Sequence, residues 1–300
     1  MDFRIPGALA EEPLPQDDPQ VPLGRANIPD NVVDIGVLGP LVVSAGGRRV
    51  RLGPALRVLL LALLCARGDS IPAGRLASLL SETGSADRSP ATLRSHVAHL
   101  RREIAGSMGE GEPVIVTDRV AGVTAYGLSV GAVRVDAWRF TRKIADGMRQ
   151  LHDGDVRRAG DTLRSAIALW RGQPMADAAG RAFAQPELRQ LESSHRAAVL
   201  ARIQADAQCG MHSVVIGELQ ALAQAWPADE AVHELLITCL WRSGRTAEAA
   251  RACLAAVETV RAEGLDSRRL ATLQYDVLNG TLPWLAGGAP QGLMLSRAAG

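Results

Sequence analysis

The sequence predicts a mainly α-helical fold with a small β component, made of a mixed N-terminal part and an all-helical C-terminal part. Runs rich in β-forming residues stand on both sides of residues 54–106, where leucines recur at helical spacing. From Val135 onward almost every segment has helical spacing, and short turns with Gly or Pro separate the segments. The chain has 300 residues, which is long enough for two domains.

Composition and charge exclude several classes of protein. The formal net charge is +1, so any nucleic-acid surface must be local. Aromatic residues make up 3%, which argues against a stacking platform for single strands. The longest apolar run, residues 58–66, is too short to span a bilayer, and the N-terminus lacks the apolar core of a signal peptide. We therefore expect a cytoplasmic protein without a membrane partner.

The N-terminal part is predicted to place strands before and after three helices. The expected elements are strands at 34–43 and 48–52, helices from Pro54 to Gly68, at 73–82 and from Ser89 to Gly106, and strands at 113–118 and 123–130. Strands, three helices and a closing hairpin are the layout of a winged helix with an N-terminal sheet. We expect this domain over residues 34–131.

The third predicted helix has the features of a DNA-reading helix. Ser89 and Pro90 suit its start, because Ser is a favoured N-cap and Pro is favoured at the first helical position. One face is an apolar stripe, formed by Leu93, Val97, Leu100 and Ile104. A helix that packs by such a stripe and shows Arg, Ser and His on the other face can enter a major groove, where Arg donates two hydrogen bonds to guanine.

We expect this polar face and the hairpin after it to bind DNA. The candidate residues on the helix are Ser89, Thr92, Arg94, Ser95, His96, His99, Arg101 and Arg102. Ser89 and Thr92 are expected at phosphates, and Arg119 at the hairpin tip in the minor groove or at a phosphate. Arg57 is expected either to contact phosphate or to form a structural pair. The alternative for the helix is a solvated amphipathic face.

The C-terminal part, residues 132–282, is predicted as an all-α domain that resembles tetratricopeptide repeats in its spacing. Gly210 and Gly244 each stand in a helix–Gly–helix turn, and 244 − 210 gives the 34-residue period of that repeat. Helices are expected near 136–152, 155–171, 185–209, 212–225, 229–242, 246–262 and 266–279. Residues 1–33, with six acidic residues and two arginines, are predicted as a disordered acidic leader, and residues 283–300 as a flexible tail.

The sequence favours neither an enzyme nor a metal site. None of the four cysteines forms a C-x-x-C pair, and we expect reduced thiols in the core. His96 and His99 are three residues apart, but no Cys or carboxylate nearby completes a tetrahedral zinc set. Sequence signatures of serine hydrolases, zinc proteases and dinucleotide-binding folds do not occur. We therefore expect no catalytic residue, no cofactor and no metal.

Six stretches, in their order and spacing, resemble the Streptomyces antibiotic regulatory protein family. They are residues 35–41 (IGVLGPL), 52–60 (LGPALRVLL), 93–102 (LRSHVAHLRR), 135–140 (VDAWRF), 168–177 (ALWRGQPMAD) and 241–249 (WRSGRTAEA). The resemblance implies an OmpR/PhoB-type winged helix followed by a tetratricopeptide-like bacterial transcriptional activation domain. Larger relatives add a nucleotide-switch domain. This chain has no G-x-x-x-x-G-K, so the resemblance is to a small member of the family.

The resemblance also implies a function and partners. It implies a transcriptional activator that binds direct repeats in double-stranded DNA near the promoter −35 element, as a homodimer on DNA. It implies contact with RNA polymerase holoenzyme through the sigma factor or the alpha or beta subunits, and control of a secondary-metabolite (antibiotic) gene cluster. Two alternatives remain: a helical-repeat scaffold for protein interaction, and a DNA-binding repressor.

The chain departs from the family pattern at three places. Leu80 and Ser81 stand where the family usually has Trp-Gly, and His99 stands where Arg is common. The hairpin segment 119–126 is longer than the usual Arg-x-x-Gly-Tyr. A neutral His cannot grip guanine as Arg does, so we expect a target sequence of its own.

Overall fold

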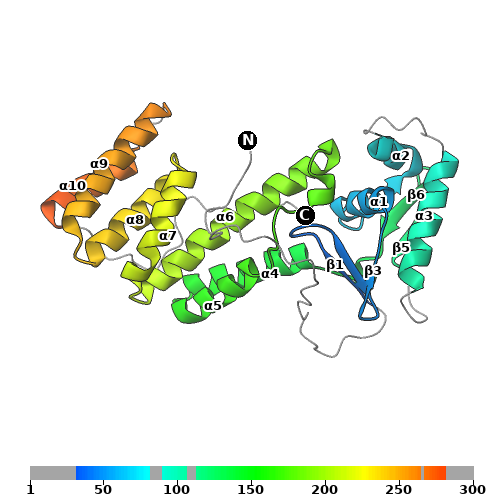
Figure 1. Ribbon diagram of the computed structural model, residues 1–300, viewed down its shortest axis with the longest axis horizontal. Coiled ribbons are helices and arrows are strands. Elements are labelled where there is room, and N and C mark those ends of the chain that lie inside the picture. The colour runs from blue at the N-terminus through cyan, green and yellow to red at the C-terminus, as the bar shows by residue number, and fades with distance from the viewer. Residues whose placement is uncertain (1–31, 82–89, 107–112, 265–266, 282–300) are drawn as a thin grey trace, which may run out of the picture. The chain divides into compact units, whose positions relative to one another are not determined.

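The computed structural model confirms a mainly helical chain with small sheets (Figure 1). It describes residues 32–81, 90–106, 113–264 and 267–281. Ser89, the predicted tail and nearly all of the predicted leader therefore lie outside the described residues. Contacts divide the described chain into two compact units, which are treated separately below. The sheet-containing unit holds residues 32–81, 90–106, 113–143 and 165–196, and the helical unit holds 144–164, 197–264 and 267–281.

A four-stranded sheet opens the sheet-containing unit, in the order β3-β2-β1-β7. The strands are β1 (Val33–Gly36), β2 (Val42–Ala45), β3 (Arg48–Val50) and β7 (Val133–Val135). The first three pair antiparallel, and β7 pairs parallel to β1. One face is buried through alternate residues, such as Ile35 and Val43. The sequence does not predict β7, because three residues show no usable periodicity.

Three helices follow and confirm the predicted order. They are α1 (Pro54–Cys65), α2 (Ala73–Ser81) and α3 (Pro90–Ala105), and each contacts the other two. Every residue of α1 from Val58 to Leu64 is buried, so α1 is the central helix of this unit.

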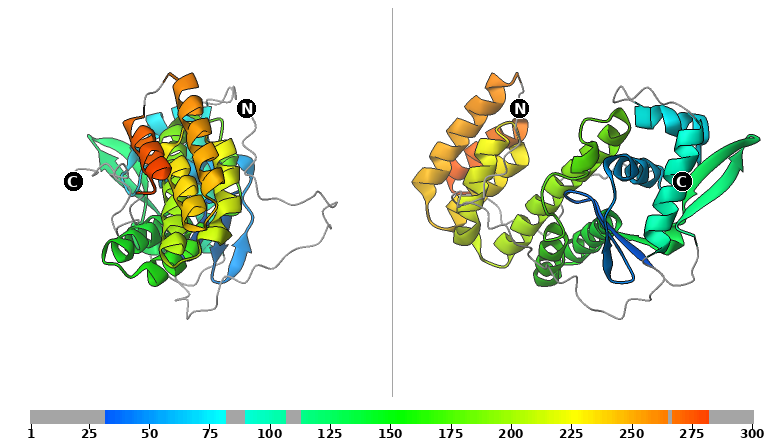
Figure 2. Two further views of the ribbon diagram at one scale, coloured as in Figure 1. Left: turned by 90° about the vertical axis from the view of Figure 1, so that its left-hand side faces the viewer. Right: turned by 45° about the vertical axis from the view of Figure 1, so that its right-hand side comes forward.

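A twisted hairpin ends the winged-helix layout and lies beside α3 (right-hand view of Figure 2). Its strands are β5 (Ile115–Val120) and β6 (Val123–Leu128), and the short β4 (Ile71–Pro72) adds to β6. The turn consists of Ala121 and Gly122, with φ of 50° and 79°. Positive φ at both central residues identifies a type I′ turn, whose twist matches that of the strands.

Replacing Ala121 with asparagine is expected to stabilise the sheet-containing unit by roughly 0.5–1 kcal/mol, because Asn tolerates the left-handed region better than Ala. Thermal unfolding of the two proteins checks this. The matched control is Thr124→Asn on the exposed part of β6, where the backbone is extended; stabilisation there as well would show that φ is not the cause.

The helical unit is built from consecutive helices that short turns join, except between α5 and α6, which residues 168–184 connect. Helices α4 (Asp136–His152), α5 (Val156–Ile167) and α6 (Gln185–Gln208) contribute residues to both units. They are followed by α7 (His212–Ala225), α8 (Glu230–Arg242), α9 (Thr246–Ala262) and α10 (Arg268–Asn279), each packed on the next. The helix predicted to reach residue 171 ends at Ile167, and residues 171–177 instead bond to residues 37–41, the loop between β1 and β2.

One glycine turn ends four of these helices. At Gly210 the next amide, Met211 N–H, donates to Asp206 O at 3.0 Å, and Gly210 N–H donates to Ala207 O at 2.9 Å. The same pair of bonds recurs at Gly154, Gly244 and Gly280. All four glycines have φ between 69° and 84°, which is the left-handed conformation of the Schellman motif. This conformation explains why glycine stands at both positions of the predicted 34-residue period.

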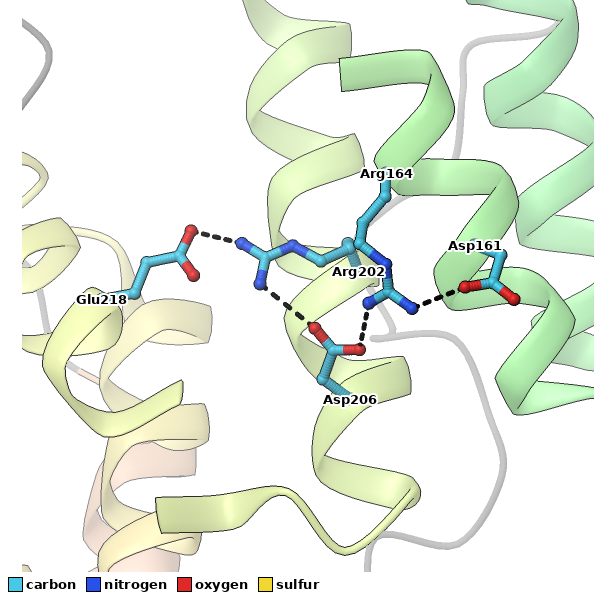
Figure 3. Close-up of polar contacts among 5 residues, drawn as sticks. All are labelled: Asp161, Arg164, Arg202, Asp206 and Glu218. Carbon is cyan, nitrogen blue, oxygen red and sulfur yellow. Dashed lines mark hydrogen bonds and ion pairs between the residues drawn. The ribbon is translucent and has the colours of Figure 1, made fainter. Parts of the chain in front are cut away.

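An ion network centred on the buried Asp206 joins α5, α6 and α7 (Figure 3). The side chain of Asp206 is 9% exposed and accepts hydrogen bonds from Arg164 Nη1 at 2.6 Å and from Arg202 Nη1 at 3.2 Å. Arg164 also pairs with Asp161 at 2.8 Å, and Arg202 pairs with Glu218. One carboxylate thus compensates two arginines drawn from different helices.

One expectation about the cysteines changes in the structure. Cys239 and Cys253 are buried, and burial raises the pKa of each thiol to about 11, but Cys209 is exposed just after α6 and is not a core thiol. Within the described ranges, His, Cys, Asp and Glu side chains nowhere gather in a group of three suited to a metal. No helix in the part of the chain described has both the length and the apolar character needed to cross a bilayer.

Candidate nucleic-acid interface

The face of α3 that points away from the core carries most of the predicted DNA-binding residues. Leu93, Val97, Leu100 and Ile104 are all buried, as the spacing predicts. The opposite face exposes Arg94, Ser95, His99 and Arg102, while Thr92 and His96 are half-buried at its border. The structure therefore brings four candidate residues together on one exposed surface.

The two outer arginines of this face have the greatest freedom to bind an anion. Arg94 and Arg102 form no ion pair or hydrogen bond with any residue that the structure describes. Between them, His99 Nε2 lies 3.1 Å from Glu103 Oε1, one helical turn away. Glu103 therefore places one carboxylate at the border of this arginine-bearing face.

Arg101 connects α3 to the hairpin. Its Nε and Nη2 donate to Ile115 O at 3.1 and 2.9 Å, and Nη2 also donates to Thr117 Oγ1 at 2.7 Å. These donors hold β5 against the helix. The structure thus gives Arg101 a positioning role that the sequence does not predict.

The hairpin tip combines one positive charge with apolar side chains. Arg119 is exposed and lies directly opposite Thr124 in the ladder. Val120 and Val123, which flank the turn, are 38% and 53% exposed. A tip of this composition fits the wall of a groove, where Arg meets phosphate or the narrow minor groove.

Arg57 lies in a structural pair, which is one of the two roles that the sequence leaves open. Its Nη1 donates to Asp177 Oδ1 at 2.7 Å and its Nε to Leu52 O at 2.9 Å. Asp177 Oδ2 also accepts from Leu41 N–H at 2.6 Å. Burial by itself would raise the pKa of Asp177, but the hydrogen bonds from Leu41 and Arg57 together hold that pKa below its ordinary value.

The lowered pKa of Asp177 predicts a stability contribution that disappears in acid. A depressed carboxyl pKa stabilises the fold above the pKa of the unfolded chain, about 4, and the effect is lost as pH falls further. We expect Asp177→Asn to lower the free energy of unfolding by about 1–2 kcal/mol at pH 7 and by much less near pH 3. Urea titrations at both pH values measure this, with the exposed Asp161→Asn as control; a loss independent of pH would contradict the assignment.

A second carboxylate fastens the first sheet to later parts of the chain. Asp136, the first residue of α4, accepts from Val37 N–H at 2.7 Å and Leu38 N–H at 3.2 Å, and pairs with Arg171 at 3.2 Å. Arg171 N–H donates to Leu38 O at 2.7 Å, and a Cβ on Gly36 would lie 2.6 Å from the Arg171 guanidinium. Three of the stretches that carry the family resemblance, residues 35–41, 135–140 and 168–177, therefore contact one another.

Comparisons with known proteins agree with this architecture. The family model of the bacterial transcriptional activator domain matches residues 135–278. The regulatory protein AfsR of Streptomyces coelicolor is 32% identical over 215 residues, which cover 71% of this chain and 21% of AfsR. The regulatory protein DnrI of Streptomyces peucetius is 29% identical over 252 residues, which cover 82% of this chain and 92% of DnrI. The chain thus spans nearly all of DnrI but only about a fifth of AfsR.

A solved structure resembles the fold of this chain over most of the chain's length. Mycobacterium tuberculosis EmbR, determined in complex with a low-affinity phosphopeptide, superposes with a TM-score of 0.76 at 27% identity. The superposition covers 84% of this chain and 66% of the EmbR chain. The order of a winged helix and a helical domain is thus shared with a protein described as a transcriptional regulatory protein.

Proposed function

Because the chain belongs to the Streptomyces antibiotic regulatory protein family of transcriptional regulators, we propose that it is a sequence-specific DNA-binding activator of transcription. The observation that carries the proposal is the exposed face of α3, held beside the hairpin by Arg101, where Arg94 and Arg102 have no partner among the described residues. A protein of this kind acts in the cytoplasm, at the nucleoid.

Each candidate residue has a role in this proposal. Arg94, Ser95, His99 and Arg102 enter the major groove, and the half-buried Thr92 and His96 line its edge. Ser89, at the start of α3 by sequence, contacts a phosphate. The β5–β6 hairpin is the wing of the winged helix, and Arg119 at its tip reaches the minor groove or the DNA backbone. Arg101 orients the wing, and Arg57 supports the fold.

The finer points of the proposal rest on the family alone. Residues 34–131 form the DNA-binding domain and residues 132–282 the domain that meets RNA polymerase. Two protomers bind direct repeats near the −35 element, and the protein switches on a secondary-metabolite gene cluster. The similarity to DnrI over 92% of its length supports a regulator of this small type.

Footprinting tests the proposal on the promoter regions of the protein's own genomic neighbourhood. We expect protection of two short direct repeats, weakening steeply with salt because bound phosphates release counterions. In vitro transcription from a protected promoter then separates activation from repression. Absence of any protection at low salt, with a protein shown to be folded, would favour the scaffold alternative.

The link between Arg101 and the wing predicts a coupled loss of affinity. We expect Arg101→Ala to weaken operator binding roughly ten-fold and Thr117→Val about three-fold, as each removes hydrogen bonds that orient β5. If Arg101 acts through the wing, Thr117→Val has little further effect once Arg101 is Ala. Additive losses in the double variant, measured by gel shift, would show instead that Arg101 touches DNA.

A further inference from the structure

The edge strand of the first sheet carries a cluster of unpaired arginines that the proposed DNA interface does not use. Arg48, Arg49 and Arg51 are all exposed, and each lacks a hydrogen-bond or ion-pair partner among the residues that the structure describes. We call these three residues the β3 arginine cluster. Val50, between them, is buried, so Arg49 and Arg51 lie on the open face of the sheet.

Neighbouring charges on the same face do not neutralise this cluster. Asp34 stands in the same cross-strand row as Arg49, with Ser44 between them. The Asp34 carboxylate is already occupied, because Arg134 donates to it through Nε at 2.9 Å and Nη2 at 2.8 Å. The open face therefore presents the positive charges of Arg49 and Arg51, while the exposed Arg48 lies at the strand edge on the side of Val50.

The register places the root of the acidic leader next to this cluster. Val33 pairs with Ala45, and Ala45 pairs with Arg48, so the chain enters β1 in the same row as Arg48. Two strand spacings separate them, which is about 10 Å. Asp30 precedes Val33 by three residues, and three extended residues also reach about 10 Å.

We propose that residues 1–31 of the acidic leader bind the β3 arginine cluster of their own chain and shield it from other polyanions. The leader holds six acidic residues against two arginines, so its charge of −4 complements the cluster. Single exposed ion pairs are weak, but the tether keeps the leader at a high effective concentration, so several such pairs act together. The proposal does not depend on DNA binding by α3.

Photo-crosslinking of the full chain tests this directly. A benzophenone amino acid replaces Leu14, which lies between the acidic pairs Glu11-Glu12 and Asp17-Asp18, and mass spectrometry maps the products. We expect most products to join the leader to residues 44–51 within one chain. About 1 M NaCl should reduce the yield about five-fold or more, because the Debye length falls to about 3 Å.

Two sets of variants separate the proposal from a loss of folding. Arg48→Glu/Arg49→Glu/Arg51→Glu should abolish the crosslink, whereas the control Arg139→Glu/Arg142→Glu/Arg261→Glu, at exposed arginines elsewhere, should keep it. Glu11→Gln/Glu12→Gln/Asp17→Asn/Asp18→Asn changes only the leader and should also abolish the crosslink. The same leader variant should elute from heparin, a polyanion probe, later than the unchanged protein. This delay should vanish when the leader changes are combined with the β3 triple variant.

Several outcomes would overturn the proposal. Crosslinks to α3 would mean that the leader covers the DNA-reading face, and crosslinks between two chains would mean that the occupant is a second copy. Crosslinks spread evenly over the chain would show that the leader has no preferred binding site. The arginines would then serve only to keep the edge strand from pairing with strands of other chains.

Discussion

Replacing Asp206 with alanine is expected to destabilise the helical unit by about 3–5 kcal/mol, because the change leaves two arginines without their shared carboxylate. Arg202 is only 13% exposed, so water reaches its guanidinium poorly, and Glu218 is then its one remaining carboxylate partner among the described residues. Hydrogen exchange of the α5 and α6 amides in the helical unit measures the loss in that unit alone.

Two variants distinguish the buried network from ordinary surface pairs. Asp161 belongs to the same network, but its side chain is 70% exposed, so Asp161→Ala should cost less than about 1 kcal/mol. Asp206→Asn keeps an acceptor and removes the charge, and it should fall between the two alanine variants. Equal losses for Asp161→Ala and Asp206→Ala would show that burial does not set the strength of these pairs.

Arg94→Ala/Arg102→Ala is expected to weaken operator binding about 100-fold, which corresponds to about 3 kcal/mol. Both side chains are exposed and without partners in the described chain, so their removal leaves the fold intact. A bidentate hydrogen-bonded contact of Arg with guanine contributes about 1–3 kcal/mol, so two such contacts account for the expected loss of affinity. Titration of labelled operator DNA at fixed salt measures it.

The salt dependence of this variant shows what the two arginines touch. If they bind bases, discrimination against a mutated operator falls; if they bind phosphates, the slope of log K against log salt becomes shallower by about one per contact. The control Arg251→Ala/Arg261→Ala removes the same charge from exposed positions of α9. An equal loss of affinity in this control would assign the effect to net charge and not to the α3 face.

In the candidate site, the spacing of residues along α3 predicts which face is exposed, but it does not predict the role of each side chain. The stripe Leu93, Val97, Leu100 and Ile104 is buried as its spacing requires, so the exposed face of α3 followed from the sequence. Arg101 belongs to that helix and has the same chemistry as Arg102, and spacing alone cannot separate them. Only the position of β5 shows that Arg101 donates to Ile115 and Thr117, while Arg102 has no partner within the residues described.

The sequence by itself determined the fold class, the order of the helices and the glycine turns, because periodicity and backbone conformation are set by residues within a few positions. It did not show that residues 34–43 form parts of two strands, β1 and β2, or that the short β4 and β7 exist, because such short strands have too little periodicity. The tertiary structure decided which polar side chains stabilise the fold through hydrogen bonds and ion pairs between distant segments. Asp136 binds Val37, Arg57 binds Asp177, and Arg164 binds Asp206, across separations of 99, 120 and 42 residues. Such pairs depend on where distant elements meet, and the same carboxylates and arginines would otherwise be expected on the surface.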